Sequence, residues 1–123
     1  DADMGMLTFA SGSHKEKAAG NVAISDESET FYSKYINEKG FPVVKADMMR
    51  AGDATFHFGW TIHCAGANLS AEKAREVMTV IYYADGTRIT PPINRHQQAD
   101  LDAWLGGLQP GDPANGHLNP LLI

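Results

Sequence analysis

The chain has one cysteine, few basic residues and no long apolar run. The single cysteine, Cys64, excludes an intrachain disulfide and fits a reducing, cytoplasmic location. No apolar stretch approaches the roughly 20 residues that span a bilayer, so no membrane segment is expected. The ten lysines and arginines are scattered and the net charge is −5, which argues against nucleic acid as a partner. A single soluble domain over residues 1–123 is therefore expected.

An alternating stretch over residues 55–63 predicts a strand. Its apolar side chains fall on one face, and its polar side chains, including His57 and His63, fall on the other. In a straight strand these two histidines would lie about 20 Å apart, too far to share one metal ion. Either the chain turns at Gly59, or only one of them binds metal. We expect His63 to be the ligand and His57 to be a structural histidine.

A second alternating stretch, residues 75–83, follows a polar loop and predicts another strand. If the two strands pair antiparallel, His63 and Arg75 lie on the same rim of the sheet. Such a pair can hold a metal ion and the carboxylate of an acid bound to it, because a guanidinium grips a carboxylate through two hydrogen bonds. Arg88, beyond the Asp85-Gly86 turn, is the fallback partner for that acid.

The remaining pattern predicts short strands and two helices. Strands are expected over 4–10 and 41–49, with a polar loop over 15–22 between them. One helix should begin with Ser25 or Asp26 as its cap and end at Gly40, and a short helix should cover 96–105. Short alternating strands separated by turn signals favour an all-β sandwich or barrel.

Three segments carry a resemblance to a known family. The first is Met4-Gly-Met-Leu-Thr-Phe-Ala-Ser-Gly-Ser-His-Lys15, and the central one runs from Gly52-Asp-Ala-Thr-Phe-His-Phe-Gly-Trp-Thr-Ile-His-Cys-Ala-Gly-Ala-Asn-Leu-Ser70. The third is the tail with Asn94-Arg-His-Gln, Trp104-Leu-Gly-Gly, Pro110-Gly-Asp and Leu118-Asn-Pro. In this order they resemble the phytanoyl-CoA dioxygenase family of Fe(II)- and 2-oxoglutarate-dependent oxygenases.

The resemblance implies a double-stranded β-helix, the cupin-like jelly roll, here a partial barrel with one inserted helix and a short C-terminal helix. It matches His63 to the distal iron ligand and Arg75 to the arginine that pairs with 2-oxoglutarate. The family's His-x-Asp motif, which supplies the other two iron ligands, does not occur before the Gly-Ser-His-Lys segment. The resemblance therefore implies the C-terminal portion of a dioxygenase that hydroxylates an aliphatic carbon of a small-molecule or acyl substrate, inactive as this chain alone.

Other residues near these motifs have simpler interpretations. His14-Lys15-Glu16 formally matches His-x-Glu and could substitute for the missing ligands, but a loop histidine with a local hydrogen bond is the expected role. Asp53 follows Gly52 in a turn between strands, where a structural role is expected. Cys64, next to His63, points to the opposite face of a strand and is interpreted as a small packed thiol.

Two alternatives to an oxygenase stay open. One is a cupin-like module that binds a carboxylate or small molecule through Arg75 without redox chemistry, and the other is a structural β-domain. A carboxylate ligand to the metal distinguishes the oxygenase from both alternatives, because only the oxygenase needs it. An incomplete barrel also leaves an exposed sheet edge, so we expect a homo-oligomer, such as a dimer in which strands of one subunit complete the sheet of the other.

Overall fold

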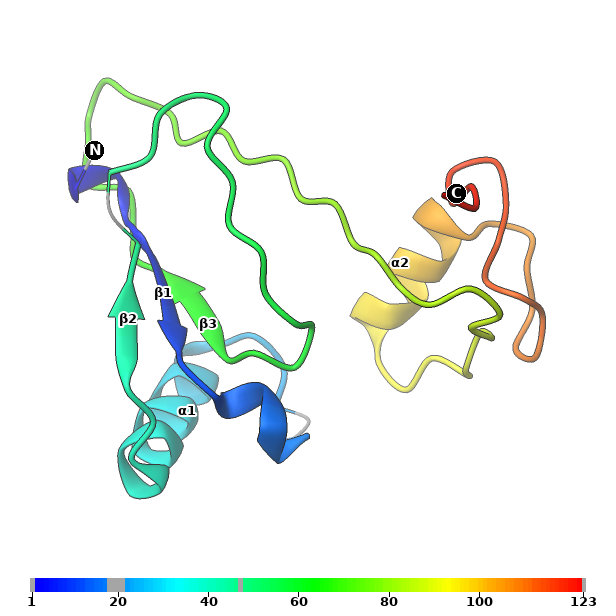
Figure 1. Cartoon of the computed structure of the whole chain (residues 1–123), viewed down its shortest axis with the longest axis horizontal. Helices are drawn as coiled ribbons and strands as arrows, with labels where there is room; N and C mark the ends of the chain where they lie inside the picture. Colours follow the sequence, from blue (N-terminus) through cyan, green and yellow to red (C-terminus); the bar gives the residue numbers. More distant parts are fainter. Residues whose placement is uncertain (1, 18–21, 47, 123) are drawn as a thin grey trace. The chain divides into compact units, whose positions relative to one another are not determined.

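The computed structural model describes residues 2–17, 22–46 and 48–122 (Figure 1). Residues 18–21 of the predicted polar loop and Asp47 of the predicted strand 41–49 lie outside these ranges. In chain order the elements are the 3-10 helix η1 (Ala2–Met4), strand β1 (Leu7–Ala10), the 3-10 helix η2 (Ser13–Glu16), helix α1 (Asp26–Lys39), strands β2 (Val43–Lys45) and β3 (His63–Ala65), and helix α2 (Arg95–Trp104). They belong to two compact units, Asp1–Val77 and Met78–Ile123.

Helix α1 begins and ends where local signals predict, and α2 lies one residue before its predicted range of 96–105. Ser25 and Ser28 form a reciprocal capping box at the start of α1: the Ser25 hydroxyl accepts from the Ser28 N–H at 3.2 Å, and the Ser28 hydroxyl accepts from the Ser25 N–H at 3.0 Å. Gly40 ends the helix at φ 66°, a left-handed conformation that glycine adopts without steric cost. In the second unit, the Asn94 side chain caps α2 through the N–H groups of His96 and Gln97.

Replacing Ser25 with alanine is expected to destabilise α1 by about 1 kcal/mol, because the Ser28 N–H loses its acceptor and the helix its cap. Ser33→Ala is the matched control, since Ser33 is an exposed residue in the interior of the same helix. Amide hydrogen exchange in the first turn of α1 measures the effect. Equal exchange rates in the two variants would contradict the prediction.

The first unit is built on a three-stranded antiparallel sheet. Figure 1 shows β1 between β2 and β3, and the order is β2-β1-β3. Phe9 pairs with Val44 on one side and with His63 on the other, while Thr8 pairs with Lys45 and Cys64. β1 begins only at Leu7, because Met4 belongs to η1 and Gly5 has a φ of 76°. The sheet is open at β2 and β3 rather than closed into a barrel.

Two predicted strands are corrected by the structure. Of residues 55–63, only His63 lies in a strand, because the chain reverses at Gly59-Trp60, where the Thr61 N–H donates to the Phe58 carbonyl at 2.9 Å. Residues 75–83 form no strand, although their pattern suits one. A strand needs a neighbour to bond to, and among the described residues this segment has no backbone partner.

Few side chains are buried in the described part of the chain. The buried apolar residues are Ala10 in the first unit, and Ile89 and Ala114 in the second. Ser13 is buried as well, and its hydroxyl accepts from the Ile62 N–H at 2.8 Å, while the Ile62 carbonyl accepts from the Ala10 N–H at 2.9 Å. These bonds fix the chain immediately before His63. No helix among the described residues is long and apolar enough to cross a membrane.

Candidate functional site

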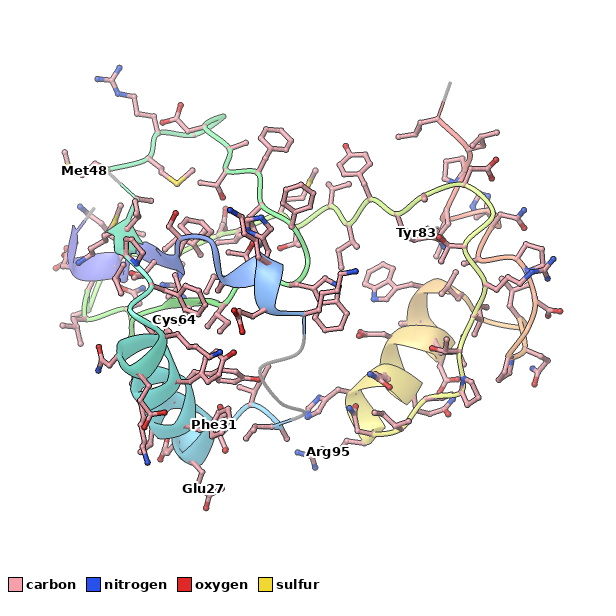
Figure 2. The ribbon with its side chains drawn as sticks, turned by 60° about the horizontal axis from the view of Figure 1, so that its bottom comes forward. Glu27, Phe31, Met48, Cys64, Tyr83 and Arg95 are labelled. Atoms are coloured by element: carbon pink, nitrogen blue, oxygen red, sulfur yellow. The ribbon has the colours of Figure 1, made fainter. Side chains whose placement is uncertain are left out.

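His63 and Cys64 lie on opposite faces of the sheet. Side chains alternate along a strand, so His63 shares a face with its partner Phe9, and Cys64 shares the other face with Thr8. Figure 2 labels Cys64, which is an exposed free thiol. The prediction that Cys64 and His63 point to opposite faces is confirmed. The prediction that Cys64 is a packed thiol is wrong, because its side chain is exposed.

His63 is held in one tautomer by a backbone contact. Its Nδ1 lies 2.8 Å from the Thr61 carbonyl oxygen, and its ring stacks on Phe9 at 6.1 Å between centroids. A carbonyl oxygen only accepts, so Nδ1 carries the proton and Nε2 carries the lone pair. A backbone carbonyl on one ring nitrogen is how proteins commonly orient a histidine that binds metal through the other.

The turn at Gly59 brings His57 next to His63. Their ring centroids lie 4.4 Å apart with an angle of 56° between the rings, and His57 also contacts Phe9 at 5.2 Å. The bent chain, one of the two alternatives open from the sequence, is the one observed. We expected His57 to be a structural histidine with a satisfied hydrogen bond. Instead its ring forms no hydrogen bond within the described part of the chain, and its contacts are with other rings.

The surroundings of His57 lower its pKa below the ordinary value of 6.5, first through partial burial and second through the charge on His63. The unfolded chain takes up this proton near pH 6.5, whereas the folded chain resists it. The contribution of neutral His57 to the free energy of unfolding is therefore complete above pH 6.5. It is lost as the pH falls from 6.5 through the pKa of His57 in the folded chain.

We predict that an NMR titration of the His57 ring in the metal-free chain gives a midpoint below 6.5. His63→Ala should raise this midpoint, because it removes the neighbouring charge. His96→Ala, on an exposed residue of α2, should leave it unchanged. A His57 midpoint at or above 6.5 in the wild-type chain would show that the ring is not desolvated as described.

The other candidate ligands are engaged in local contacts. His14 stacks on Phe58 at 5.0 Å. Glu16 accepts from Lys39 Nζ at 2.9 Å and from the Tyr35 hydroxyl at 3.5 Å, and the hydrogen bond from Lys39 lowers the pKa of its carboxyl. Asp53 accepts from the Arg50 N–H at 2.7 Å, which confirms its structural role in a turn. The Glu16 carboxylate thus joins η2 to α1, and the described residues include no group of three side chains that could hold a metal ion.

Arg75 binds backbone carbonyls at the far end of β3. Its Nη1 donates to the carbonyl oxygens of Met4 at 2.9 Å, Gly5 at 2.7 Å and Gly66 at 2.9 Å. We refer to these three bonds as the Arg75 clasp. His63 begins β3 and Gly66 follows its end, so the clasp and His63 are about 10 Å apart along the strand. The prediction that residues 75–83 form a strand and place Arg75 on the same rim as His63 is therefore wrong.

Arg88, the fallback partner, belongs to the second unit. Its Nη1 donates to the Gly111 carbonyl at 2.6 Å, close to the bridge between Arg88 and Pro113. This bond ties together the loop that carries the buried Ile89 and Ala114. The described contacts of Arg88 are thus structural.

Each face of the sheet carries a shallow hollow. On the face of Phe9 and His57, a hollow of about 470 Å³ is lined mainly by aromatic and small residues: Phe9, Ser11, Gly12, His14, Val44, Thr55, Phe56, His57, Phe58 and Thr61. On the face of Thr8, a hollow of about 350 Å³ is lined by Gly5, Met6, Thr8, Lys45, Cys64, Gly66, Ala67 and Leu69. Two of its lining residues, Gly5 and Gly66, hold the Arg75 clasp.

The family of the chain follows from its first 77 residues. A family model described as phytanoyl-CoA dioxygenase (PhyH) matches residues 1–77, more than half of the chain. The chain belongs to this family. The matched segment ends at Val77, which is also the last residue of the first structural unit. Searches of curated proteins and of solved structures return no match.

Phytanoyl-CoA dioxygenases have a cupin-type jelly roll and use Fe(II) with 2-oxoglutarate. Enzymes of this kind hold iron with two histidines and one carboxylate. The described residues contain no group of three histidine, cysteine, aspartate or glutamate side chains that could hold a metal ion. The described residues thus do not complete the iron site that the family uses. His57 and His63 could contribute at most two imidazole ligands to such a site.

Proposed function

We propose that this chain supplies part of the active site of an Fe(II)- and 2-oxoglutarate-dependent dioxygenase with a jelly-roll fold. The proposed reaction is hydroxylation of an aliphatic carbon in a small-molecule or acyl substrate. His63 is the proposed distal metal ligand, and Arg75 the proposed partner of the far carboxylate of 2-oxoglutarate. A His-x-Asp pair outside the described residues would supply the other ligands, so this chain alone is inactive.

The observation that carries the proposal is the tautomer of His63. The Thr61 carbonyl holds the Nδ1 proton and leaves Nε2 as a lone-pair donor, which a metal ligand requires. This arrangement lies within the residues that match the family.

Arg75 retains donors for a carboxylate. A guanidinium has five N–H donors, and only those on Nη1 take part in the clasp with described residues. The edge formed by Nε and Nη2 makes no hydrogen bond with the described part of the chain and has the forked geometry that a carboxylate fits. The clasp would then orient this edge while the carboxylate binds.

A calorimetric titration with 2-oxoglutarate, under anaerobic conditions with Fe(II), tests the proposal. Arg75→Lys is the informative variant, because an ammonium can still donate to the clasp carbonyls but cannot bind a carboxylate in a fork. We expect it to weaken 2-oxoglutarate binding at least tenfold, whereas Arg88→Lys, the same change in the second unit, leaves binding unchanged. Equal affinity in the Arg75 and Arg88 variants would overturn the role of Arg75.

The same titration, followed by visible absorption, distinguishes an incomplete site from a complete one. We expect no visible charge-transfer band from chelated iron, because the described residues contain no group of three side chains that could hold the ion. A band would mean that the site is completed within this chain or between copies, and His14 and Glu16 would return as candidate ligands. The alternative of a carboxylate-binding module is favoured if 2-oxoglutarate binding needs Arg75 but is independent of Fe(II) and of His63.

We also propose that the chain self-associates through strand addition, with a second copy as the partner. β2 and β3 are open edges, and the unpaired segment 77–83 is rich in β-branched and aromatic residues with exposed side chains, such as Val77 at 73% and Ile81 at 79%. The exposed thiol of Cys64 supports a reducing, cytoplasmic location for such an assembly.

Sedimentation analysis is expected to show a dimer or larger oligomer for the wild-type chain and a shift toward monomer for Ile81→Lys. A charge on the added strand opposes edge pairing. Ile24→Lys is the control, because Ile24 is 94% exposed but lies outside segment 77–83. A wild-type chain that stays monomeric at micromolar concentrations would contradict the proposal.

A further inference from the structure

The ring centroids of His57 and His63 lie about as far apart as those of two imidazoles that bind one metal ion. Two imidazoles that bind one ion hold their nitrogens about 2.0–2.1 Å from it, with an angle at the metal between about 90 and 109°. Each ring centroid then lies about 3.2 Å from the ion, so the centroids are about 4.5–5.2 Å apart. The observed separation is 4.4 Å. The rings need to move apart by less than about 1 Å to accept a metal ion between them.

Both rings have nitrogens available for binding. The Thr61 carbonyl occupies only Nδ1 of His63, and within the described ranges no hydrogen bond reaches the ring of His57. Imidazole nitrogens favour zinc, copper and nickel among the divalent ions.

The backbone holds the two histidines in this arrangement before any ion binds. The reverse turn at Gly59-Trp60 sets the path between them, and the buried Ser13 hydroxyl fixes Ile62, one residue before His63. Phe9 contacts both imidazole rings, at 5.2 Å and 6.1 Å between centroids. A site whose ligands are already oriented loses less conformational freedom on binding.

We propose that His57 and His63 together form a two-histidine site for a divalent late transition-metal ion such as Zn(II), with the remaining coordination positions open to water or to a ligand. The inference rests on the proposed role of His63 as a metal ligand and extends it to His57. The site is thus formed within this chain, without a residue from elsewhere. His57 also lines the aromatic hollow of about 470 Å³.

A Zn(II) titration of the metal-free chain tests the proposal, with affinity measured by competition against a chromophoric chelator. We expect one ion per chain, and at least a tenfold weaker affinity for His57→Ala and for His63→Ala. The double variant should lose little more than either single variant, because one remaining imidazole no longer chelates. His96→Ala and His117→Ala are matched controls on exposed histidines of the second unit and should bind like the wild type.

The pattern of losses separates the inference from the proposed function. If His63→Ala weakens binding but His57→Ala and His57→Gln do not, the two-histidine site is wrong and His63 remains a candidate ligand. If neither His57 nor His63 affects Zn(II) binding, the two-histidine site is wrong. The proposed function, in which His63 binds Fe(II) together with ligands from outside the described residues, is then decided by the titration with Fe(II) and 2-oxoglutarate. Nitrogen-15 shifts of the imidazole rings provide a second readout: Zn(II) should shift Nε2 of His63 while the Nδ1 proton is retained. Loss of that proton on metal binding would overturn the orientation described here.

Discussion

Gly5→Ala is expected to destabilise the sheet of the first unit by about 3 kcal/mol or more. Gly5 has a φ of 76°, where a residue with a side chain pays roughly 1–2 kcal/mol. A Cβ atom at this position would also overlap the carbonyl oxygen of Gly66 and lie 2.6 Å from Nη1 of Arg75. Backbone atoms cannot move aside as a flexible side chain can, so the start of β1 and the end of β3 would have to separate.

Gly12→Ala separates the steric overlap from the backbone conformation. Gly12 also has a positive φ, of 85°, but nothing lies within 4 Å of the position that its Cβ would take. It should therefore cost only the conformational part, about 1–2 kcal/mol. Amide hydrogen exchange of Phe9 and Cys64 in the paired strands measures both variants. Similar exchange rates in the two would mean that the close approach of Gly5 and Gly66 is not maintained.

Arg75→Ala is expected to cost the same sheet about 1–2 kcal/mol. The Arg75 clasp joins the chain before β1 to the residue after β3 through three carbonyl oxygens. Hydrogen bonds from a charged donor contribute about 1.5–3 kcal/mol, and we expect less here because the residue is exposed and water can replace it. Faster hydrogen exchange at the start of β1 and at the end of β3 should report the loss.

Two comparisons make the prediction on Arg75 specific. Arg88→Ala removes a similar bond to the Gly111 carbonyl, but in the second unit, and should leave exchange in β1 and β3 unchanged. Gly5→Ala already displaces Nη1 of Arg75, so the double variant should be less destabilised than the sum of the single changes. Strict additivity would indicate that Arg75 and Gly5 are not in contact.

The Arg75 clasp also bears on how the proposed 2-oxoglutarate site is organised. The sequence pattern predicts one role for Arg75, as partner of a carboxylate. The structure adds a second role, because the same guanidinium joins the chain before β1 to the residue after β3 at one end of the sheet. Substitutions of Arg75 thus affect stability and ligand binding at once, and Arg75→Lys is the variant that distinguishes the two roles.

The sequence alone determined the helices, the turns and the family. The Ser25 cap, the Gly40 stop and the Asn94 cap act through contacts within a few residues, so the pattern specifies them without knowledge of the fold. The turns at Gly52-Asp53 and Asp85-Gly86 are equally local. The motifs around His14 and His63 placed the chain in its family by residue identity, before any contact was known.

Only the tertiary structure decided which strands pair and which histidines meet. Residues 55–63 and 75–83 have the alternation of strands, but a strand is stabilised by hydrogen bonds to a neighbour that alternation does not identify. The reverse turn at Gly59 was one of two alternatives in the sequence, and it brings His57 within 4.4 Å of His63. The Arg75 clasp joins residues about 70 positions apart, and no local pattern encodes such a contact, because it depends on where β1 and β3 lie after the sheet has formed.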